Sequence, residues 1–243
     1  MPHRPRATRA QARLSAVAAY RAAISWSAGK DSWLALVRER EAGRRVDTFV
    51  TMCDADGTSK SHALAPGLVE AQVRALGGVP MAVRVPDGEY AARFDAALRA
   101  LAASGHTHVV FGDIDLQAHR DWLEPACAGA GLVARFPLWG EPRRALAREL
   151  VGRGVQARVV CVDTAFLDAS YCGADYDAAF LDRLPPAVCP CGEDGEFHTF
   201  VAGGPGFAAP LRVVDAGERR VASRPPFRPT EFVFRTLALE AGA

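Results

Sequence analysis

The sequence predicts an α/β fold, in which a parallel sheet carries helices on both faces and a smaller α+β domain follows. Between residues 22 and 130, short runs rich in β-forming residues alternate with amphipathic stretches of helical length. Such alternation is typical of parallel sheets. From Pro137 onward the alternation stops and the segments become irregular and glycine-rich. The 243 residues suffice for one large domain or two modest ones.

The first domain is predicted to contain four strands, each followed by a helix. Glycines after three of the helices suit C-terminal caps. The expected strands are 22–26, 46–52, 79–85 and 108–111, and the helices run from Lys30 to about 41, then 64–76, 89–103 and 117–130.

The second domain is predicted less sharply. A helix over 143–152 leads to a strand over 157–162, and 167–184 has mixed character. From Leu211 on, apolar and polar residues alternate. We expect a basic tail over 1–21, a nucleotide-binding domain over 22–134, a smaller acceptor domain over 135–225 and a C-terminal tail over 226–243.

Composition excludes several classes of protein. A net charge of +1 argues against nucleic acid as the main partner. No apolar run approaches the roughly 20 residues of a membrane span. The six cysteines include no Cys-x-x-Cys pair, so we interpret them as reduced thiols of a cytoplasmic protein. The acid-free N-terminal tail is interpreted as a solvated extension, with a transit peptide or an electrostatic arm as the alternatives.

The most informative segment is the loop after the first strand. Of the 29 Lys and Arg residues only Lys30 and Lys60 are lysines, and Lys30 lies in Ser27-Ala28-Gly29-Lys30-Asp31-Ser32. A helix start with free N–H groups, hydroxyls from Ser25, Ser27 and Ser32 and one ammonium group is suited to an anion. A Walker A motif is excluded, because Asp31 stands where that motif needs Ser or Thr. A plain strand-to-helix turn is the alternative.

Three polar loops leave the carboxyl ends of predicted parallel strands: 27–32, 54–62 and 112–115. Ligands bind at this edge of such sheets, so we expect the loops to converge on one crevice. Gly112 allows close approach of the backbone, and Asp113 is expected to hold Mg²⁺ or to orient a substrate there. The alternative is that Asp113 caps the next helix.

The six-residue loop resembles the Ser-Gly-Gly-Lys-Asp-Ser loop of the PP-loop ATP pyrophosphatases. Ala28 stands where that family has Gly, and an alanine is unstrained there only if its φ is negative. Further motifs together resemble the diphthine–ammonia ligase family, bacterial type, over roughly residues 22–207. These motifs are Gly112-Asp113-Ile114, Arg120, Glu124, Pro137-Leu138-Trp139 and Gly192-Glu193-x-Gly195-Glu196-Phe197-x-Thr199-Phe200.

The resemblance implies a Rossmann-like sheet of the HUP class and an ATP-dependent ligase that uses Mg²⁺. ATP would transfer AMP to a carboxylate with release of pyrophosphate, and ammonia would then displace AMP from the acyl-adenylate to form an amide. The acceptor is a small molecule or a protein carboxylate, and a homodimer is compatible with the resemblance. The nucleotide would contact Ser25, Ser27, Ala28, Gly29, Lys30, Asp31, Ser32 and Gly112.

The same resemblance assigns catalytic roles to Lys30, Asp113, Glu193 and Glu196. Substrate contacts are expected from Glu193 and Glu196 again, together with His62, His198 and Thr199. From the residues alone, the two glutamates also fit a solvated acidic turn, and His62 fits an exposed loop residue.

Two other functions remain open at this point. One is a regulatory module that holds ATP or AMP without turnover, and the other is a PP-loop sulfur-transfer enzyme, for which Cys191 is the cysteine within a motif. A zinc site of Cys189, Cys191 and His198 is disfavoured, because Cys-x-Cys spacing is unusual and no fourth ligand is evident. The acceptor, the nitrogen donor, the oligomeric state and the roles of Cys189 and Cys191 are not determined by the sequence.

Overall fold

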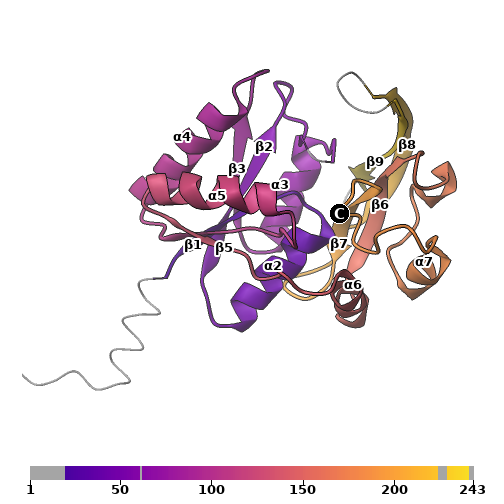
Figure 1. Cartoon of the computed structure of the whole chain (residues 1–243), viewed down its shortest axis with the longest axis horizontal. Coiled ribbons are helices and arrows are strands. Elements are labelled where there is room, and N and C mark those ends of the chain that lie inside the picture. The colour runs from indigo at the N-terminus through magenta and orange to yellow at the C-terminus, as the bar shows by residue number, and fades with distance from the viewer. Residues whose placement is uncertain (1–19, 61, 224–228, 241–243) are drawn as a thin grey trace, which may run out of the picture.

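The computed structural model describes residues 20–60, 62–223 and 229–240. Its N-terminal half is a parallel five-stranded sheet in the order β3-β2-β1-β4-β5, which confirms the predicted fold class (Figure 1). The strand that the sequence did not predict is the last one, which has three residues and lies at the edge. The strands are β1 (Ala22–Ser25), β2 (Val46–Cys53), β3 (Val79–Arg84), β4 (His108–Val110) and β5 (Val133–Arg135).

Two separate apolar clusters cover the two faces of this sheet. Alternation along β1 directs Ala23 to one cluster and Ile24 to the other, since neighbouring side chains on a strand point to opposite faces. The Ile24 cluster includes side chains of α2 (Lys30–Glu41) and α3 (Pro66–Ala75), and the Ala23 cluster includes side chains of α4 (Tyr90–Ala103) and α5 (Gln117–Gly129).

The order of the strands reverses at β1. Strand β1 pairs with β2 on one side and with β4 on the other, so the carboxyl ends of β1 and β4 are adjacent. The Ser27–Ser32 loop follows β1, and Gly112 follows β4. This is the topological switch point, the place where open parallel sheets bind their ligands.

The C-terminal half forms a second, antiparallel sheet in the order β7-β6-β9-β8. The expectation of a C-terminal tail from residue 226 is wrong, because β9 lies between two other strands and Val233 is fully buried. Phe232 and Phe234 alternate around Val233 as a strand requires. The elements are α6 (Arg143–Gly152), β6 (Gln156–Asp163), η1 (Ala169–Tyr171), α7 (Ala178–Arg183), β7 (Phe197–Gly203), β8 (Val213–Ala222) and β9 (Glu231–Leu239).

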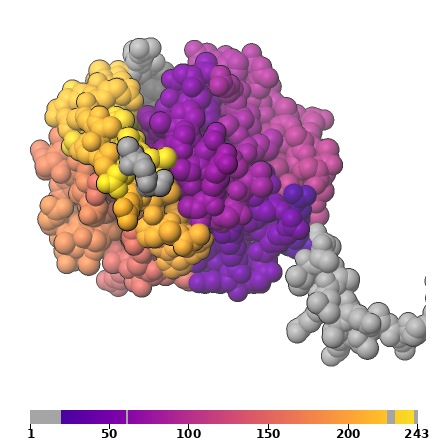
Figure 2. Space-filling model, turned by 180° about the vertical axis from the view of Figure 1, so that it is seen from behind, coloured from indigo at the N-terminus to yellow at the C-terminus, as the bar shows by residue number. Residues whose placement is uncertain are grey.

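The two halves share one apolar core. The cluster around Ile24 and α2 continues into Val159 and Phe200 of the second sheet. Figure 2 shows the C-terminal part lying directly against the N-terminal part. Hydrogen bonds cross the junction from Trp33 Nε1 to Pro205 O at 3.2 Å and from Ala208 N to Ala75 O at 2.8 Å. None of the helices among the described residues has the length and apolar character needed to span a bilayer.

Candidate active site

A cavity of about 570 Å³ opens at the carboxyl ends of the parallel strands. The loop after β1, the end of β2 and the turn after β4 form one side of it. The opposite wall comes from the second half of the chain, in two stretches at 191–193 and 197–199. The three polar loops of the first domain therefore all contribute to the lining, together with these two stretches of the second half.

The phosphate-binding loop predicted from the sequence begins α2. Gly29 is the N-cap of this helix, with its N–H 3.2 Å from Ser27 Oγ and its carbonyl accepting from Ser32 Oγ at 3.0 Å. The hydroxyls of Ser27 and Ser32 lie 3.1 Å apart, and Ser25 also lines the cavity. The first N–H groups of an α-helix have no partner within the helix, so this end presents donors and a positive dipole to an anion.

Ala28 adopts a φ of +68°, so the condition for an unstrained alanine is not met. The left-handed region costs an alanine roughly 1–2 kcal/mol. The residue is fully buried, and its carbonyl accepts hydrogen bonds from Val201 N and from Gln72 Nε2, both at 3.0 Å. These contacts from β7 and α3 hold the strained turn in place.

Lys30 is only 3 % exposed and points into the cavity. Its Nζ donates to Asp31 Oδ2 at 2.7 Å and to the carbonyl of Cys191, while its backbone N–H donates to Thr199 Oγ1 at 3.1 Å. Burial lowers the pKa of Lys30, but attraction to Asp31, and then to Cys191 and Glu193, outweighs burial, and the pKa is raised. The side chain is therefore an ammonium at neutral pH.

Three carboxylates, those of Asp31, Asp113 and Glu193, line the same cavity as this ammonium group. Oδ1 of Asp31 is buried and has no hydrogen-bond partner among the described residues. Asp113 lines the cavity and is 2.9 Å from His119 Nδ1. Burial raises the pKa of Glu193 to about 8, and repulsion from Asp31 adds to the effect. Burial also raises the pKa of Asp31, although Lys30 opposes the shift.

Gly112 fixes the distance between the end of β4 and the start of α2. A Cβ at this position would lie 2.7 Å from Ser32 N and 2.9 Å from the carbonyl carbon of Asp31. Real Cβ atoms do not approach backbone atoms so closely, so only glycine fits. The close approach expected from the sequence is present.

His62 and His198 face each other at the cavity wall. Their ring centroids are 4.8 Å apart at an interplanar angle of 74°. His62 is buried rather than an exposed loop residue, and Thr199, next to His198, holds the backbone of Lys30. The structure thus brings both histidines and Thr199 to the same cavity as Lys30.

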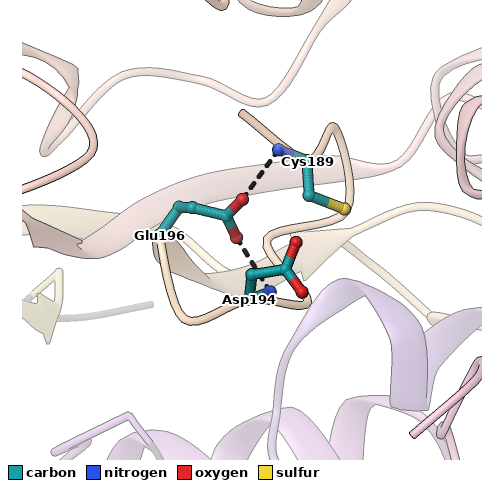
Figure 3. A group of neighbouring side chains, drawn as sticks. All are labelled: Cys189, Asp194 and Glu196. Carbon is teal, nitrogen blue, oxygen red and sulfur yellow. Dashed lines mark hydrogen bonds between the residues drawn. The ribbon is translucent and has the colours of Figure 1, made fainter. Parts of the chain in front are cut away.

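Glu196 lies outside the lining of the cavity, in contrast to Glu193. It is 1 % exposed, and its carboxylate accepts from Cys189 N at 2.7 Å and from Asp194 N at 2.9 Å (Figure 3). The carboxylate therefore organises the loop that carries Glu193, and its position gives no support to the expected contact with substrate.

The group of Cys189, Asp194 and Glu196 has ligand atoms within 4.8 Å of one another (Figure 3). Asp194 is paired with Arg143 at 2.9 Å, and both oxygens of Glu196 accept backbone N–H groups. A hydrogen bond from the neighbouring Cys191 thiol lowers the pKa of Cys189 to about 6. Arg143 also lowers it, and burial acts in the opposite direction. Because its charges are already compensated by protein groups, we do not assign a metal ion to this group.

The sequence reasoning missed an aromatic wall of the cavity, formed by residues of α4 and α5. Tyr90, Phe94 and Trp122 line it, with the rings of Phe94 and Trp122 5.0 Å apart and those of Tyr90 and Trp122 6.0 Å apart. Tyr90 and Trp122 are each about 40 % exposed. The signal was a pair of aromatic residues four apart at the start of a predicted helix, where one face should have been polar.

Three motif residues lie elsewhere. Arg120 pairs with Glu124 at 2.7 Å and stacks 4.9 Å from the centre of the Trp139 ring, and none of the three lines the cavity. They stabilise the connection between α5 and the segment that enters the second half of the chain.

Two family models match the chain in order. The model of the diphthamide synthase N-terminal domain matches residues 20–134, and that of the diphthamide synthase C-terminal domain matches residues 142–224. No curated protein matches it.

Proposed function

The chain belongs to the diphthamide synthase family, and we propose that it is an ATP-dependent ligase that adenylates a carboxylate and then forms an amide with ammonia. The observation that supports this most directly is the start of α2. There a buried ammonium, the N-terminus of a helix and a buried carboxylate oxygen without a partner among the described residues meet in one cavity. Together they suit the phosphates of a nucleotide and the ion that accompanies them.

We assign the pyrophosphate half of ATP to the Ser27–Ser32 loop. Gly29 lets phosphate oxygens approach the backbone, and Lys30 lies where it offsets the charge that builds on the departing pyrophosphate. The aromatic wall of Tyr90 and Trp122 offers a stacking surface for the base.

Magnesium fits the acidic edge of this cavity. Mg²⁺ is usually bound by one or two carboxylates and by substrate phosphates. Asp31 supplies an unpartnered buried oxygen, and Asp113 supplies a second carboxylate. Bound there, the ion would neutralise charge on the phosphates.

In the first step of the proposed reaction, an acceptor carboxylate oxygen bonds to the α-phosphorus and the bond to pyrophosphate breaks. In the second, the ammonia nitrogen bonds to the acyl carbon, AMP leaves, and nitrogen loses one proton. Glu193 is the group we assign to take that proton, since a pKa of about 8 matches a base that works near neutral pH.

The sulfur-transfer alternative has weaker support. The neighbouring Cys189, and then burial, raise the pKa of the Cys191 thiol, and its Sγ donates to Arg143 O at 3.1 Å. A thiol held in its protonated form is a poor nucleophile. Retained pyrophosphate release in Cys191→Ser would exclude a catalytic thiol at this position.

A cytoplasmic location also belongs to this proposal, supported by six unpaired cysteines.

The test is to incubate the protein with ATP, Mg²⁺, ammonium and a panel of carboxylates, and to follow pyrophosphate, AMP and amide. We expect AMP and amide in equal amounts with at least one carboxylate. Lys30→Ala should lower kcat by about 10²–10³, as the loss of a charge-stabilising donor does. Binding of ATP without any pyrophosphate release would favour the regulatory module instead.

A further inference from the structure

Two imidazoles at the cavity wall lack the partners that buried polar groups normally have. His62 is 8 % exposed, and its Nδ1 is buried without a hydrogen bond. Within the described ranges, neither His62 nor His198 makes a hydrogen bond through a ring nitrogen; the two rings contact each other edge to face. More than nine in ten buried polar groups are paired, so the unpaired, buried Nδ1 of His62, on a ring that lines the cavity beside the half-buried ring of His198, indicates a ligand.

The position of the pair indicates which part of the ligand it meets. A Cβ on Gly29 would lie 3.1 Å from His62 Nε2 and 3.2 Å from Thr199 O, so the imidazole of His62 lies against the phosphate-binding loop itself. His198 precedes Thr199, whose hydroxyl accepts from the backbone of Lys30. Both rings are therefore at the phosphate end of the cavity and not at the aromatic wall.

The two lysines near the Ser27–Ser32 loop are already paired with carboxylates, which leaves little positive charge for a polyanion. The ammonium of Lys30 is paired with Asp31, and Lys60, on the same loop as His62, is paired with Asp54. The charged group that acts on both imidazoles is Lys30 from α2, and His198 also acts on His62. Among the residues that the structure describes, no carboxylate offsets the effect of Lys30 on either ring, so an incoming phosphate would bring negative charge beside them.

Both imidazoles are neutral while no anion is bound. Burial lowers the pKa of His62 well below its usual value, with repulsion from His198 and Lys30 adding to the effect. Burial and Lys30 lower the pKa of His198 to about 4. An adjacent negative charge acts in the opposite direction and favours the protonated ring.

We propose that His62 and His198 form a second anion contact for the pyrophosphate half of the nucleotide, and that the pair takes up a proton from solvent when this anion binds. The inference rests on the proposed function in that it takes the anion to be part of ATP. The proton returns to solvent when pyrophosphate leaves. Affinity for the nucleotide then falls as pH rises, by up to about tenfold per pH unit when one proton is linked.

The test is calorimetric titration at pH 6 with Mg²⁺ and α,β-methylene-ATP, which cannot release pyrophosphate, in buffers of different ionisation enthalpy. We expect an uptake of about 0.5–1 proton per bound nucleotide. The His62→Gln, His198→Gln double variant should lose the uptake and bind more weakly. His108→Gln is the matched control, because His108 begins β4 at the opposite edge of the sheet and does not line the cavity.

The outcomes separate this inference from the proposed reaction. Three results would overturn the inference: no proton uptake by the wild-type protein with nucleotide bound, unchanged uptake in the double variant, or binding of neither α,β-methylene-ATP nor inorganic pyrophosphate. The first of these results requires no variant. Histidine-dependent uptake on binding inorganic pyrophosphate, without amide formation from any carboxylate, would support the anion contact and count against the ligase. Amide formation without proton uptake would do the reverse.

Discussion

Replacing Gly112 with alanine is expected to abolish most of the proposed pyrophosphate release, although no charged group is changed. The added Cβ would lie 2.7 Å from Ser32 N and 2.9 Å from the carbonyl carbon of Asp31. Both are backbone atoms in the first turn of α2, so no side-chain rotation can relieve the clash. The end of β4 and the start of α2 must separate by roughly 0.5–1 Å to reach ordinary contact distance.

Two magnitudes follow from this displacement. Overpacking by one methyl group in a closely packed region costs about 1–3 kcal/mol of stability. The larger effect is on the reaction, because the first turn of α2 carries Lys30 and Asp31. A misplacement of about 1 Å in groups that position a substrate can lower the rate about 10²-fold. We therefore expect a folded protein whose pyrophosphate release is nearly lost.

Pyrophosphate release and urea denaturation on the same samples measure both effects. Gly152→Ala is the matched control: it adds the same methyl group at the end of α6, where a Cβ would meet nothing within 4 Å. That variant should retain full activity and gain roughly 0.5–1 kcal/mol of stability. If Gly112→Ala released pyrophosphate at the wild-type rate, the close contact would not control the site and the reasoning would be refuted.

Three further substitutions test individual residues. Glu193→Gln should be more stable than the wild type by an amount that grows from about pH 4.5 to about pH 8. Over this range the wild-type carboxyl ionises in the unfolded chain but stays protonated in the folded protein, whose pKa is raised, so the wild-type protein loses stability as pH rises. Urea denaturation across this pH range checks it, and a constant difference would contradict it. Ala28→Gly should change stability by less than about 1 kcal/mol, since roughly 1–2 kcal/mol of released strain is offset by a lost buried methyl group and a more flexible unfolded chain; calorimetry giving a loss above 2 kcal/mol would count against strain at this residue. Glu196→Ala should cost about 2–4 kcal/mol, because the N–H groups of Cys189 and Asp194 lose their acceptor, and a full-strength fold with abolished turnover would instead indicate a direct catalytic role.

Local patterns were sufficient to predict the first domain. Strands such as 46–52 are runs of β-forming residues, and a parallel sheet follows whenever helices separate them. The convergence of the loops at 27–32 and 112–115 then follows from topology alone, because carboxyl ends of parallel strands share an edge. Strand β5, by contrast, has three residues and is formed by pairing with β4 rather than by its own propensity.

The second domain depends on contacts that sequence patterns do not encode. In the sequence, strand β9 shows only an irregular alternation of apolar and polar residues near the end of the chain. Its position between β6 and β8 is fixed by long-range pairing. Glu193 and Glu196 are equivalent in the sequence motif, yet one faces the cavity and the other binds backbone N–H groups. Three residues of separation along an irregular loop do not determine which carboxylate points inward.

The geometry of the Ser27–Ser32 loop depends on both halves of the chain. The carbonyl of Ala28 accepts from Val201 N, the N–H of Lys30 donates to Thr199, and the ammonium of Lys30 donates to Cys191 O. Each such bond contributes about 1 kcal/mol, so together they exceed the roughly 1–2 kcal/mol of strain at Ala28. A first domain without the second sheet would lose the bonds that hold this turn at positive φ. It follows that the loop, although local in sequence, takes its binding geometry only when β7 is packed against α2.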